Sequence, residues 1–388
     1  MVIAEIEFTI IELILLGIMI LAFAYQLFYY FRYIHVVMAH QRKNIKTSKI
    51  FLSEQPPVSV VICARDEADN LNKFLPQILE QDYPDFEVIV VNDGSTDATE
   101  LLVKDLKEKY PNLRSTFVPT GATNLSTKKL ALTLGFKAAK NEWILLTDAD
   151  CMPENNRWIA NMARHFEPGV EFVLGYSPYL VQKGFLNRLI TYDTLLVGLQ
   201  YLGFALRGKP YMGVGRNMAY RKEVFFRMKG FASNLHLRSG DDDLMVNAAA
   251  TALNTKVEVS TESITWSEPK KAWRDWLFQK ERHLSVASFY SSKSKVQLVM
   301  EPASKAFFYE AFVLVLIFGN FITIIAAGCM YLIRYTIICI VLNKAAQHFR
   351  DRRYFFSLVI LDLLLPLVNL YLVSFGRMGS KSKNIYWK

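Results

Sequence analysis

The run Trp143-Ile144-Leu145-Leu146-Thr147-Asp148-Ala149-Asp150 joins an apolar segment of strand length to two carboxylates one residue apart. Like charges this close at the tip of a buried strand repel each other unless a partner neutralises them. A divalent cation carrying a bound phosphate would do so, because such cations prefer oxygen ligands. A D-x-D sequence is common by chance, so its meaning depends on the surrounding chain.

Upstream of this run, short apolar segments alternate with helical ones. The predicted strands are 58–63, 87–91, 113–118 and 143–146, and the predicted helices are 67–80, 96–109 and 127–139, the second capped by Ser95 or Thr96. Such alternation predicts an α/β fold with a mostly parallel sheet and right-handed crossovers. Ligands bind these sheets at the carboxyl ends of the strands. Polar segments fall at those ends: Arg65-Asp66-Glu67, Asp93 and Asp148-Ala149-Asp150.

The two ends of the chain are apolar. The 388 residues are 52% hydrophobic, and residues 6–30 carry only two charges, Glu7 and Glu12, which predicts a transmembrane helix. A signal peptide is the alternative, but the basic residues follow the apolar run, and no small-residue cleavage site comes after it. A predicted aromatic belt at the membrane surface follows, formed by Phe28, Tyr29, Tyr30, Phe31 and Tyr33. Beside it lie the cations Arg32, Arg42, Lys43, Lys46 and Lys49. By the positive-inside rule the chain then enters the cytoplasm.

The C-terminal region returns to membrane character. Residues 307–342 are mostly apolar, with Glu310 and Arg334 as their charged residues, and form either one long helix or a tight hairpin, and 355–375 is a further span. A third possibility makes 335–354 an amphipathic interfacial helix. The predicted organisation is an anchor with a basic flank over 1–50, a cytoplasmic catalytic domain over 51–292, and a membrane region with two or three spans over 293–388.

Much of the net charge of +9 lies beside the membrane segments, in the cations named beside the aromatic belt and in Arg350, Arg352, Arg353, Lys381, Lys383 and Lys388. Cations in that position suit anionic lipid headgroups. The sequence contains no nucleic-acid-binding motif, so the predicted partner is the lipid bilayer and not a nucleic acid.

A series of motifs follows in a fixed order. They are Ala64-Arg65-Asp66-Glu67, Asn92-Asp93-Gly94-Ser95-Thr96-Asp97, Lys128-Lys129-Leu130-Ala131-Leu132, Asp148-Ala149-Asp150, Gly240-Asp241-Asp242 and Gln279-Lys280-Glu281-Arg282-His283. This order resembles that of membrane-bound family-two glycosyltransferases with a GT-A (Rossmann-like nucleotide-diphospho-sugar transferase) domain, a family related to processive polysaccharide synthases and lipid glycosyltransferases. The resemblance runs from about residue 58 to 289.

The resemblance implies a role for each motif. The donor-binding residues would be Ala64, Arg65, Glu67, Asp93, Lys128, Lys129, Asp148, Gln279 and Arg282. Asp150, with Asp148, would bind Mn²⁺ or Mg²⁺, and Asp242 in preference to Asp241 would be the general base. The stretch 213–220 resembles a glycine-rich acceptor-side strand, so Gly213, Gly215 and His283 are the acceptor-side candidates.

These residue types suit their implied roles. Asp93 offers acceptors for a uracil or ribose, and an arginine such as Arg282 pairs with a diphosphate. Lys128 and Lys129 are equally compatible with solvated positions on a helix. The three adjacent carboxylates after Gly240 are likewise compatible with a solvated loop. His283 as the base itself is a lesser alternative.

The function implied is an inverting, metal-dependent hexosyltransferase in a bacterial plasma membrane. It would move a sugar from a nucleotide-diphospho-sugar, a UDP-sugar in the first instance, to a lipid or lipid-linked glycan at the cytoplasmic face. His283 stands where many processive synthases have Trp, which disfavours the alternative of a polysaccharide synthase. A non-catalytic nucleotide-sugar-binding subunit is a second alternative. A nucleotidyltransferase is disfavoured by the acidic first turn.

Overall fold

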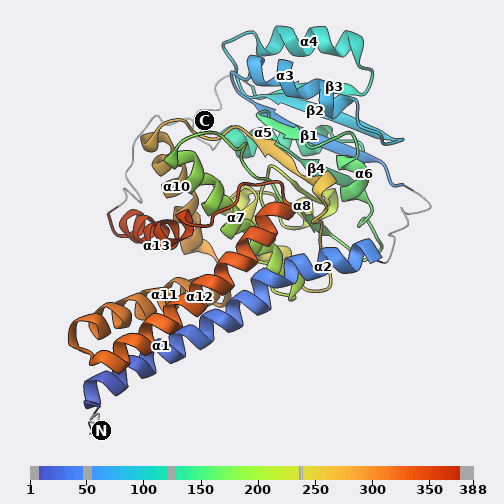
Figure 1. The fold of residues 1–388 in the computed structure, drawn as a ribbon. Coiled ribbons are helices and arrows are strands. Elements are labelled where there is room, and N and C mark those ends of the chain that lie inside the picture. Colours follow the sequence, from blue (N-terminus) through green and yellow to red (C-terminus); the bar gives the residue numbers. More distant parts are fainter. Residues whose placement is uncertain (1–7, 47–54, 120–126, 236, 238, 376–388) are drawn as a thin grey trace, which may run out of the picture.

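The computed structural model describes residues 8–46, 55–119, 127–235, 237 and 239–375. It consists of a sheet domain and a bundle of long helices that extends away from it (Figure 1). The predicted α/β class and mostly parallel sheet are confirmed.

The main sheet has seven strands in the order β3-β2-β1-β4-β7-β6-β8. Strands β3, β2, β1 and β4 are mutually parallel, β7 is antiparallel to both β4 and β6, and β8 is parallel to β6. The strands are β1 Val58–Ala64, β2 Phe86–Asn92, β3 Leu113–Phe117, β4 Trp143–Leu146, β6 Phe172–Leu174, β7 Met218–Arg221 and β8 Thr255–Val257. A small antiparallel pair joins β5 Cys151–Pro153 to β9 Thr265–Ser267.

Helices cover the two faces of this sheet. Successive side chains of β1 alternate between two apolar cores, with Val60 and Ile62 in one and Val61 and Cys63 in the other, as expected for a strand buried on both faces. The helices of the sheet domain are α3 Ala68–Leu79, α4 Thr99–Lys109, α5 Thr127–Ala138, α6 Trp158–Ala163, α7 Phe185–Leu206, α8 Lys222–Arg227, α9 Asp243–Ala249 and α10 Trp273–Val286. Short 3₁₀ turns occupy Ala232–Asn234, Thr261–Ser263 and Ala287–Phe289.

Two local predictions were wrong. The second helix begins at Thr99, because Ser95 and Thr96 form a turn that hydrogen-bonds to Asp66 instead of capping a helix. The stretch 213–220 is strand only from Met218 onward, so Gly213 and Gly215 lie in the preceding loop.

The long-helix bundle contains α1 Ile10–Tyr29, α11 Ser292–Phe318 and α12 Phe321–His348. A π-helical segment Tyr30–Ile34 and α2 His35–Lys46 continue α1 toward the sheet domain. The α11–α12 turn reaches the start of α1, where the Asn320 N–H donates to Glu12 Oε1 at 2.5 Å. At the other end His348 Nε2 lies 2.7 Å from the Val259 carbonyl oxygen in the sheet domain. Residues 307–342 therefore form the predicted hairpin. The two alternatives, a single long helix and an interfacial helix over 335–354, do not occur.

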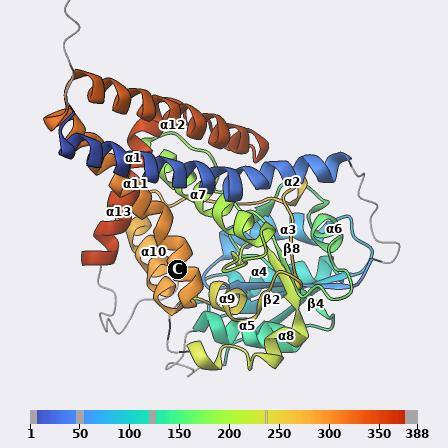
Figure 2. The ribbon, with the colours of Figure 1, turned by 90° about the horizontal axis from the view of Figure 1, so that it is seen from below.

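Helix α13, Ser357–Phe375, packs on α10 and α7 and runs across α1 instead of along it (Figure 2). Within the described residues, four helices are long and apolar enough to cross a membrane: Ile10–His40, Phe185–Leu206, Phe321–His348 and Ser357–Phe375. Of these α7 was not anticipated, and it is apolar because it is largely buried within the protein.

The aromatic residues after α1 are partly core residues. Tyr29, Tyr30 and Tyr33 are buried, and Tyr33 stacks on Phe204 of α7 with ring centroids 4.2 Å apart. The prediction that all five aromatic residues form a membrane-surface belt was therefore wrong, since these three tyrosines pack inside the protein. The cations Lys49, Lys381, Lys383 and Lys388 lie outside the described residues.

Candidate active site

The turns that follow β1 and β2 are joined into one rim. Asp66, with φ of 48°, donates its N–H to Ser95 Oγ at 2.9 Å and accepts the Thr96 N–H at 2.6 Å. The rim brings the Arg65 guanidinium to 3.7 Å from the buried carboxylate of Asp93. A positive φ is costly for a residue other than glycine, and these two cross-turn bonds hold Asp66 in that conformation.

The D-x-D carboxylates follow β4 directly. Asp150 is mostly buried and accepts a 3.0 Å hydrogen bond from Ser267 Oγ of β9. Burial, and then the neighbouring Asp148, raises the pKa of the Asp150 carboxyl. A divalent cation would relieve the repulsion between Asp148 and Asp150, because hard cations take carboxylate oxygens as ligands. Among the described residues no three His, Cys, Asp or Glu side chains cluster as a metal site, so the donor diphosphate and water would have to complete the coordination.

Lys128 on the first turn of α5 connects two acidic motifs. Its Nζ lies 3.2 Å from Asp148 Oδ1 and 3.4 Å from Asp241 Oδ2. Burial opposes the charge on Lys128, but Asp148, Asp241 and Asp242 outweigh it and raise the pKa of Lys128. Burial would likewise raise the pKa of Asp241, and Lys128 reverses this and lowers it. Lys128 and Asp241 therefore remain an ion pair at neutral pH.

The neighbouring Lys129 faces a different part of the protein. Its buried Nζ donates to the carbonyl oxygens of Asn234, Leu237 and Ser239, at 2.6, 2.9 and 2.9 Å. Burial lowers the pKa of Lys129 to about 8. Lys129 thus anchors the loop that leads to Gly240 and Asp241.

Asp242 is held by backbone donors on both of its carboxylate oxygens. The Gly215 N–H donates to Oδ2 at 2.6 Å, and the Asp243 N–H donates to Oδ1 at 2.9 Å. Burial, and then Asp241, raises the pKa of Asp242 to about 6. Asp243 points elsewhere and accepts a hydrogen bond from the Tyr290 hydroxyl at 2.8 Å.

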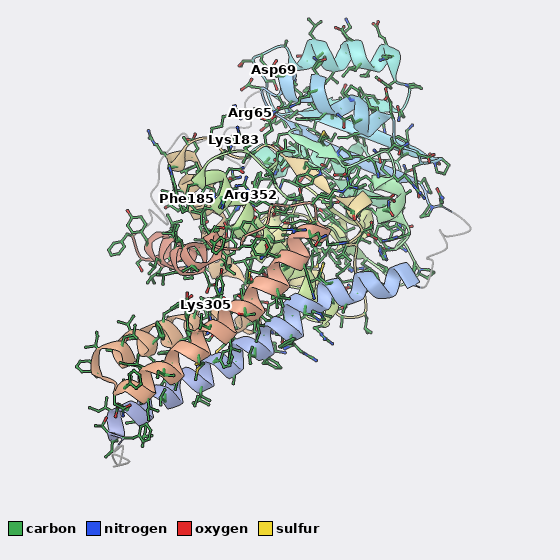
Figure 3. All side chains as sticks on the ribbon, viewed as in Figure 1. Arg65, Asp69, Lys183, Phe185, Lys305 and Arg352 are labelled. Atoms are coloured by element: carbon green, nitrogen blue, oxygen red, sulfur yellow. The ribbon has the colours of Figure 1, made fainter. Side chains whose placement is uncertain are left out.

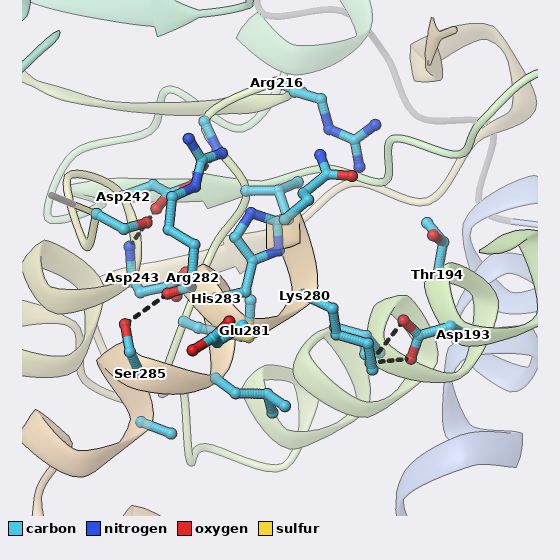
Figure 4. Close-up of a pocket in the computed structure, with 18 of the residues that line it drawn as sticks. Asp193, Thr194, Arg216, Asp242, Asp243, Lys280, Glu281, Arg282, His283 and Ser285 are labelled. Carbon is cyan, nitrogen blue, oxygen red and sulfur yellow. Dashed lines mark hydrogen bonds and ion pairs between the residues drawn. The ribbon is translucent and has the colours of Figure 1, made fainter. Parts of the chain in front are cut away.

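Helix α10 forms the opposite wall. Figure 4 shows Arg282 and His283 extending from α10 toward Asp242 and Arg216. Gln279 Nε2 donates to the Tyr179 hydroxyl at 3.0 Å. Burial, and then the nearby cations Arg282 and Arg216, lowers the pKa of His283 to about 3, so its imidazole is neutral at physiological pH.

Arg216 is a site residue that the sequence did not single out. Its guanidinium lies 4.3 Å above the Tyr179 ring and donates to the Ser177 carbonyl oxygen at 3.0 Å. Its Nη1 is buried and has no hydrogen-bond partner within the described part of the chain. The sequence feature that could have identified Arg216 is its position directly after the two glycines of the 213–220 stretch.

One cavity of about 2780 Å³ connects these groups. The predicted residues that line it are Arg65, Glu67, Asp93, Lys128, Asp148, Asp150, Gly215, Asp241, Asp242, Gln279, Arg282 and His283. Three predicted residues do not line it, namely Ala64, Lys129 and Gly213. Ala64 instead accepts the Asp93 N–H at its carbonyl oxygen, and Gly213 packs against Leu174 and Met218.

Comparisons with known proteins agree with this architecture. Residues 59–227 match the family model "Glycosyl transferase family 2", a range that includes Asp93 and the D-x-D and ends before Asp241. The mannosyltransferase PcManGT from Pyrobaculum calidifontis, solved with GDP-Man and Mn²⁺, is similar at 20% identity over 88% of this chain and 99% of that one, with a TM-score of 0.54. TarS from S. aureus matches at 17% identity over 66% of this chain and 43% of its own, with a TM-score of 0.43. No curated protein matched the sequence. The chain therefore contains a glycosyl transferase family 2 domain of the GT-A fold, accompanied by helices long and apolar enough to cross a membrane.

Proposed function

We propose that this protein is a membrane-anchored, inverting hexosyltransferase. It moves a sugar from a nucleotide-diphospho-sugar, a UDP-sugar in the first instance, to a hydroxyl of a lipid or lipid-linked glycan at the cytoplasmic face. One observation carries the proposal: Lys128 lies between the D-x-D and the Asp241–Asp242 pair, within 3.4 Å of Asp148 and Asp241, at the edge of one cavity. A donor diphosphate and a base can thus meet there.

The donor end of the cavity has the chemistry that a nucleotide-diphospho-sugar requires. Asp93 and the Arg65 turn bind the nucleoside, and Asp148 and Asp150 hold Mn²⁺ or Mg²⁺. Such an ion, when bound, neutralises charge on the departing diphosphate. Lys128, Arg216 and Arg282 add positive charge around the same group. The similar protein PcManGT was solved with both a nucleotide sugar and Mn²⁺.

Asp242 is the proposed base. Its two backbone hydrogen bonds fix the carboxylate, and its raised pKa lies near working pH, where general-base catalysis is efficient. Asp242 takes the proton from the acceptor hydroxyl as the oxygen attacks the anomeric carbon. Attack from the face opposite the diphosphate breaks the sugar–phosphate bond and inverts the configuration.

The membrane arrangement supports a single addition to a lipid-type acceptor over polymer secretion. The bundle α1, α11 and α12 consists of three helices packed on one another, with Met19 and Ala327 buried at their contacts. His283 offers a smaller stacking surface than Trp. The hairpin returns residues 344–353, rich in cations, to the side of the sheet domain, which favours the cytoplasm for both. We propose the same division of the chain as from the sequence: an anchor over 1–50, a catalytic domain over 51–292 and a C-terminal membrane region over 293–388.

The test is nucleoside-diphosphate release by the purified protein with a panel of nucleotide sugars, in the presence and absence of Mn²⁺ or Mg²⁺. Release from one donor is expected, and it should be lost in Asp150→Asn and Asp242→Asn. The matched control is Asp105→Asn, an exposed carboxylate on α4, which should behave as wild type. Tight donor binding without release, even with native lipid extract, would point to a non-catalytic nucleotide-sugar-binding subunit instead.

A further inference from the structure

Helix α13 runs across the long-helix bundle instead of beside it. Figure 2 shows α1 and α12 lying along one direction and α13 lying across that direction. Two contacts with α12 agree with this. The Tyr335 hydroxyl donates to the Phe355 carbonyl oxygen at 2.8 Å, and Arg334 lies 2.7 Å from Asp362. Residues 355 and 362 thus meet neighbouring positions of α12, whereas a helix packed lengthwise on α12 would meet positions progressively further along it. Helix α13 therefore leaves the bundle at this level.

One face of α13 stays with the sheet domain along the helix. Leu365, Asn369 and Val373 all line the active-site cavity, and their spacing of four residues puts them on one side of the helix. Asp362, one turn earlier, lies 3.1 Å from Lys305 of α11, where the bundle meets the sheet domain (Figure 3). The helix also packs on α10 and α7. From Asp362 onward α13 thus follows the sheet domain and does not descend along the bundle.

The other face of α13 is apolar and exposed. Its side chains recur at helical spacing and are 44–62% exposed, and together they form what we call the outer face: Val359, Ile360, Leu363, Leu367, Leu370 and Tyr371. Phe356 just before the helix and Phe375 at its end are 91% and 76% exposed. A continuous apolar surface of this kind marks contact with a membrane or with another protein.

The charges beside α13 favour the membrane. Cations lie on both sides of the helix in the sequence, namely Arg350, Arg352 and Arg353 before it and Arg377, Lys381, Lys383 and Lys388 after it. If α13 crossed the bilayer, one of these two groups would lie outside the cell, against the positive-inside rule. If α13 lies along the cytoplasmic surface, both groups stay on the side where anionic headgroups attract them.

We infer that α13 does not cross the membrane but lies in its cytoplasmic leaflet, with the outer face against the lipid chains just below the headgroups. Interfacial helices bury their apolar face by about 5–10 Å in this way. The inference rests on the membrane anchorage in the proposed function and not on the transfer reaction. It puts residues 353 and 374 on the same side of the membrane. Through Leu365 and Asn369, it also puts one wall of the active-site cavity at the lipid surface.

Cysteine labelling tests the first consequence. Arg353→Cys and Ser374→Cys, both at exposed positions, are compared in a background with Cys329 and Cys339 replaced. Each variant is treated with a membrane-impermeant maleimide in intact cells and in inverted membrane vesicles. Both cysteines should react from the same side, opposite to Phe321→Cys at the hairpin turn. Reaction of the residue 374 cysteine from the opposite side, or from neither side, overturns the inference and leaves the anchorage intact. Reaction of the cysteines at 321 and 353 from one side shows instead that the bundle does not cross, and then the anchorage and the inference both fall.

A depth measurement tests the outer face itself. Nitroxides are attached to Val359→Cys, Leu363→Cys, Leu367→Cys and Leu370→Cys in lipid nanodiscs, and the effects of oxygen and of a water-soluble nickel complex on their saturation are compared. A helix in the leaflet gives similar, shallow depths at all four positions. A crossing helix gives a depth that is greatest near its middle, with residue 367 about 12 Å deeper than residue 359 at 1.5 Å per residue.

The control for depth is Leu101→Cys on α4, a leucine that is 62% exposed on the sheet domain, which should be reached by the nickel complex as a label in water is. A depth that rises toward residue 367 overturns the inference. So do outer-face labels that are shielded from both reagents and broadened by spin–spin coupling, because a second copy of the chain would then cover this face in place of lipid.

Discussion

The backbone N–H of Gly215 donates a 2.6 Å hydrogen bond to Oδ2 of Asp242. This contact joins the loop before β7 to the start of α9, two segments that share no local sequence pattern. The loop can approach so closely because residue 215 has no side chain. Gly215 therefore acts on the candidate base through its backbone, and a substitution there changes the position of Asp242 without removing it.

Gly215→Ala should lower kcat with little change in the donor KM. An added Cβ would lie 3.3 Å from Asp242 Oδ2, which forces the carboxylate to shift by a few tenths of an ångström. Misplacement of a catalytic group by about 1 Å costs about 100-fold, so a loss of about tenfold is expected. Steady-state kinetics of nucleoside-diphosphate release measure it. Gly328→Ala, where a Cβ meets nothing within 4 Å, is the control, and equal kinetics for the two variants would contradict the prediction.

The pH dependence of turnover should report the ionisation of Asp242. A base must be unprotonated, and the pKa of Asp242 is raised to about 6 by burial and by Asp241. The rate should therefore be full well above pH 6 and fall as the pH drops through that value. Asp241→Asn removes the negative neighbour and should move this limb to lower pH. A profile of kcat/KM between about pH 5 and 8 in which the limb stays fixed or moves upward would count against Asp242 as the base.

The sheet was predictable because its signals are local. Strand β4 was predicted at its observed bounds, since a short apolar run between polar turns has few alternative structures. The start of α4 was misplaced because Ser95 and Thr96 bind Asp66, a residue brought close by the sheet. The membrane topology was undecided for the same reason. The contact between Glu12 and Asn320, which places the hairpin turn beside the start of α1, joins residues 308 positions apart in the sequence.

The candidate site was predictable as a set of motifs but not as a set of contacts. Lys128 and Lys129 read alike in sequence, but successive helix residues point about 100° apart. One therefore reaches the carboxylates of the cavity and the other anchors a loop. Arg216 was missed because its significance depends on Tyr179 and Ser177, which come from a different segment.

Arg216→Lys should weaken binding of nucleoside diphosphates without weakening binding of the free nucleoside. Lysine keeps the charge but loses the planar group that lies over Tyr179 and the buried Nη1, for which the described residues supply no hydrogen-bond partner. Calorimetry with a nucleoside diphosphate and with the matching nucleoside separates the two contributions. Arg188→Lys at an exposed position serves as control. Equal weakening of both ligands would show that Arg216 only supports the fold.

Asp362 should be essential for the stability of the helical part. Its buried carboxylate lies 2.7 Å from Arg334, 3.1 Å from Lys305 and 2.8 Å from the Tyr309 hydroxyl. Asp362→Ala leaves two buried cations without their shared carboxylate, and breaking such a pair costs about 3–5 kcal/mol. A clear drop in thermal midpoint in detergent is expected, beside no change for the exposed Glu310→Gln on α11. A midpoint within a degree or so of wild type would mean that water replaces the lost carboxylate.

The proposed orientation predicts opposite accessibility at the two ends of α12. Its start lies at the hairpin turn beside Glu12, and its end lies beside the sheet domain. In a background with the exposed Cys329 and the partly exposed Cys339 replaced, a cysteine at Phe321, which is 79% exposed, should react with a membrane-impermeant maleimide in intact cells. A cysteine at the exposed Arg353 should react only after lysis. The reverse pattern would put the active-site cavity outside the cytoplasm, away from nucleotide sugars, and would remove the basis for a cytoplasmic donor.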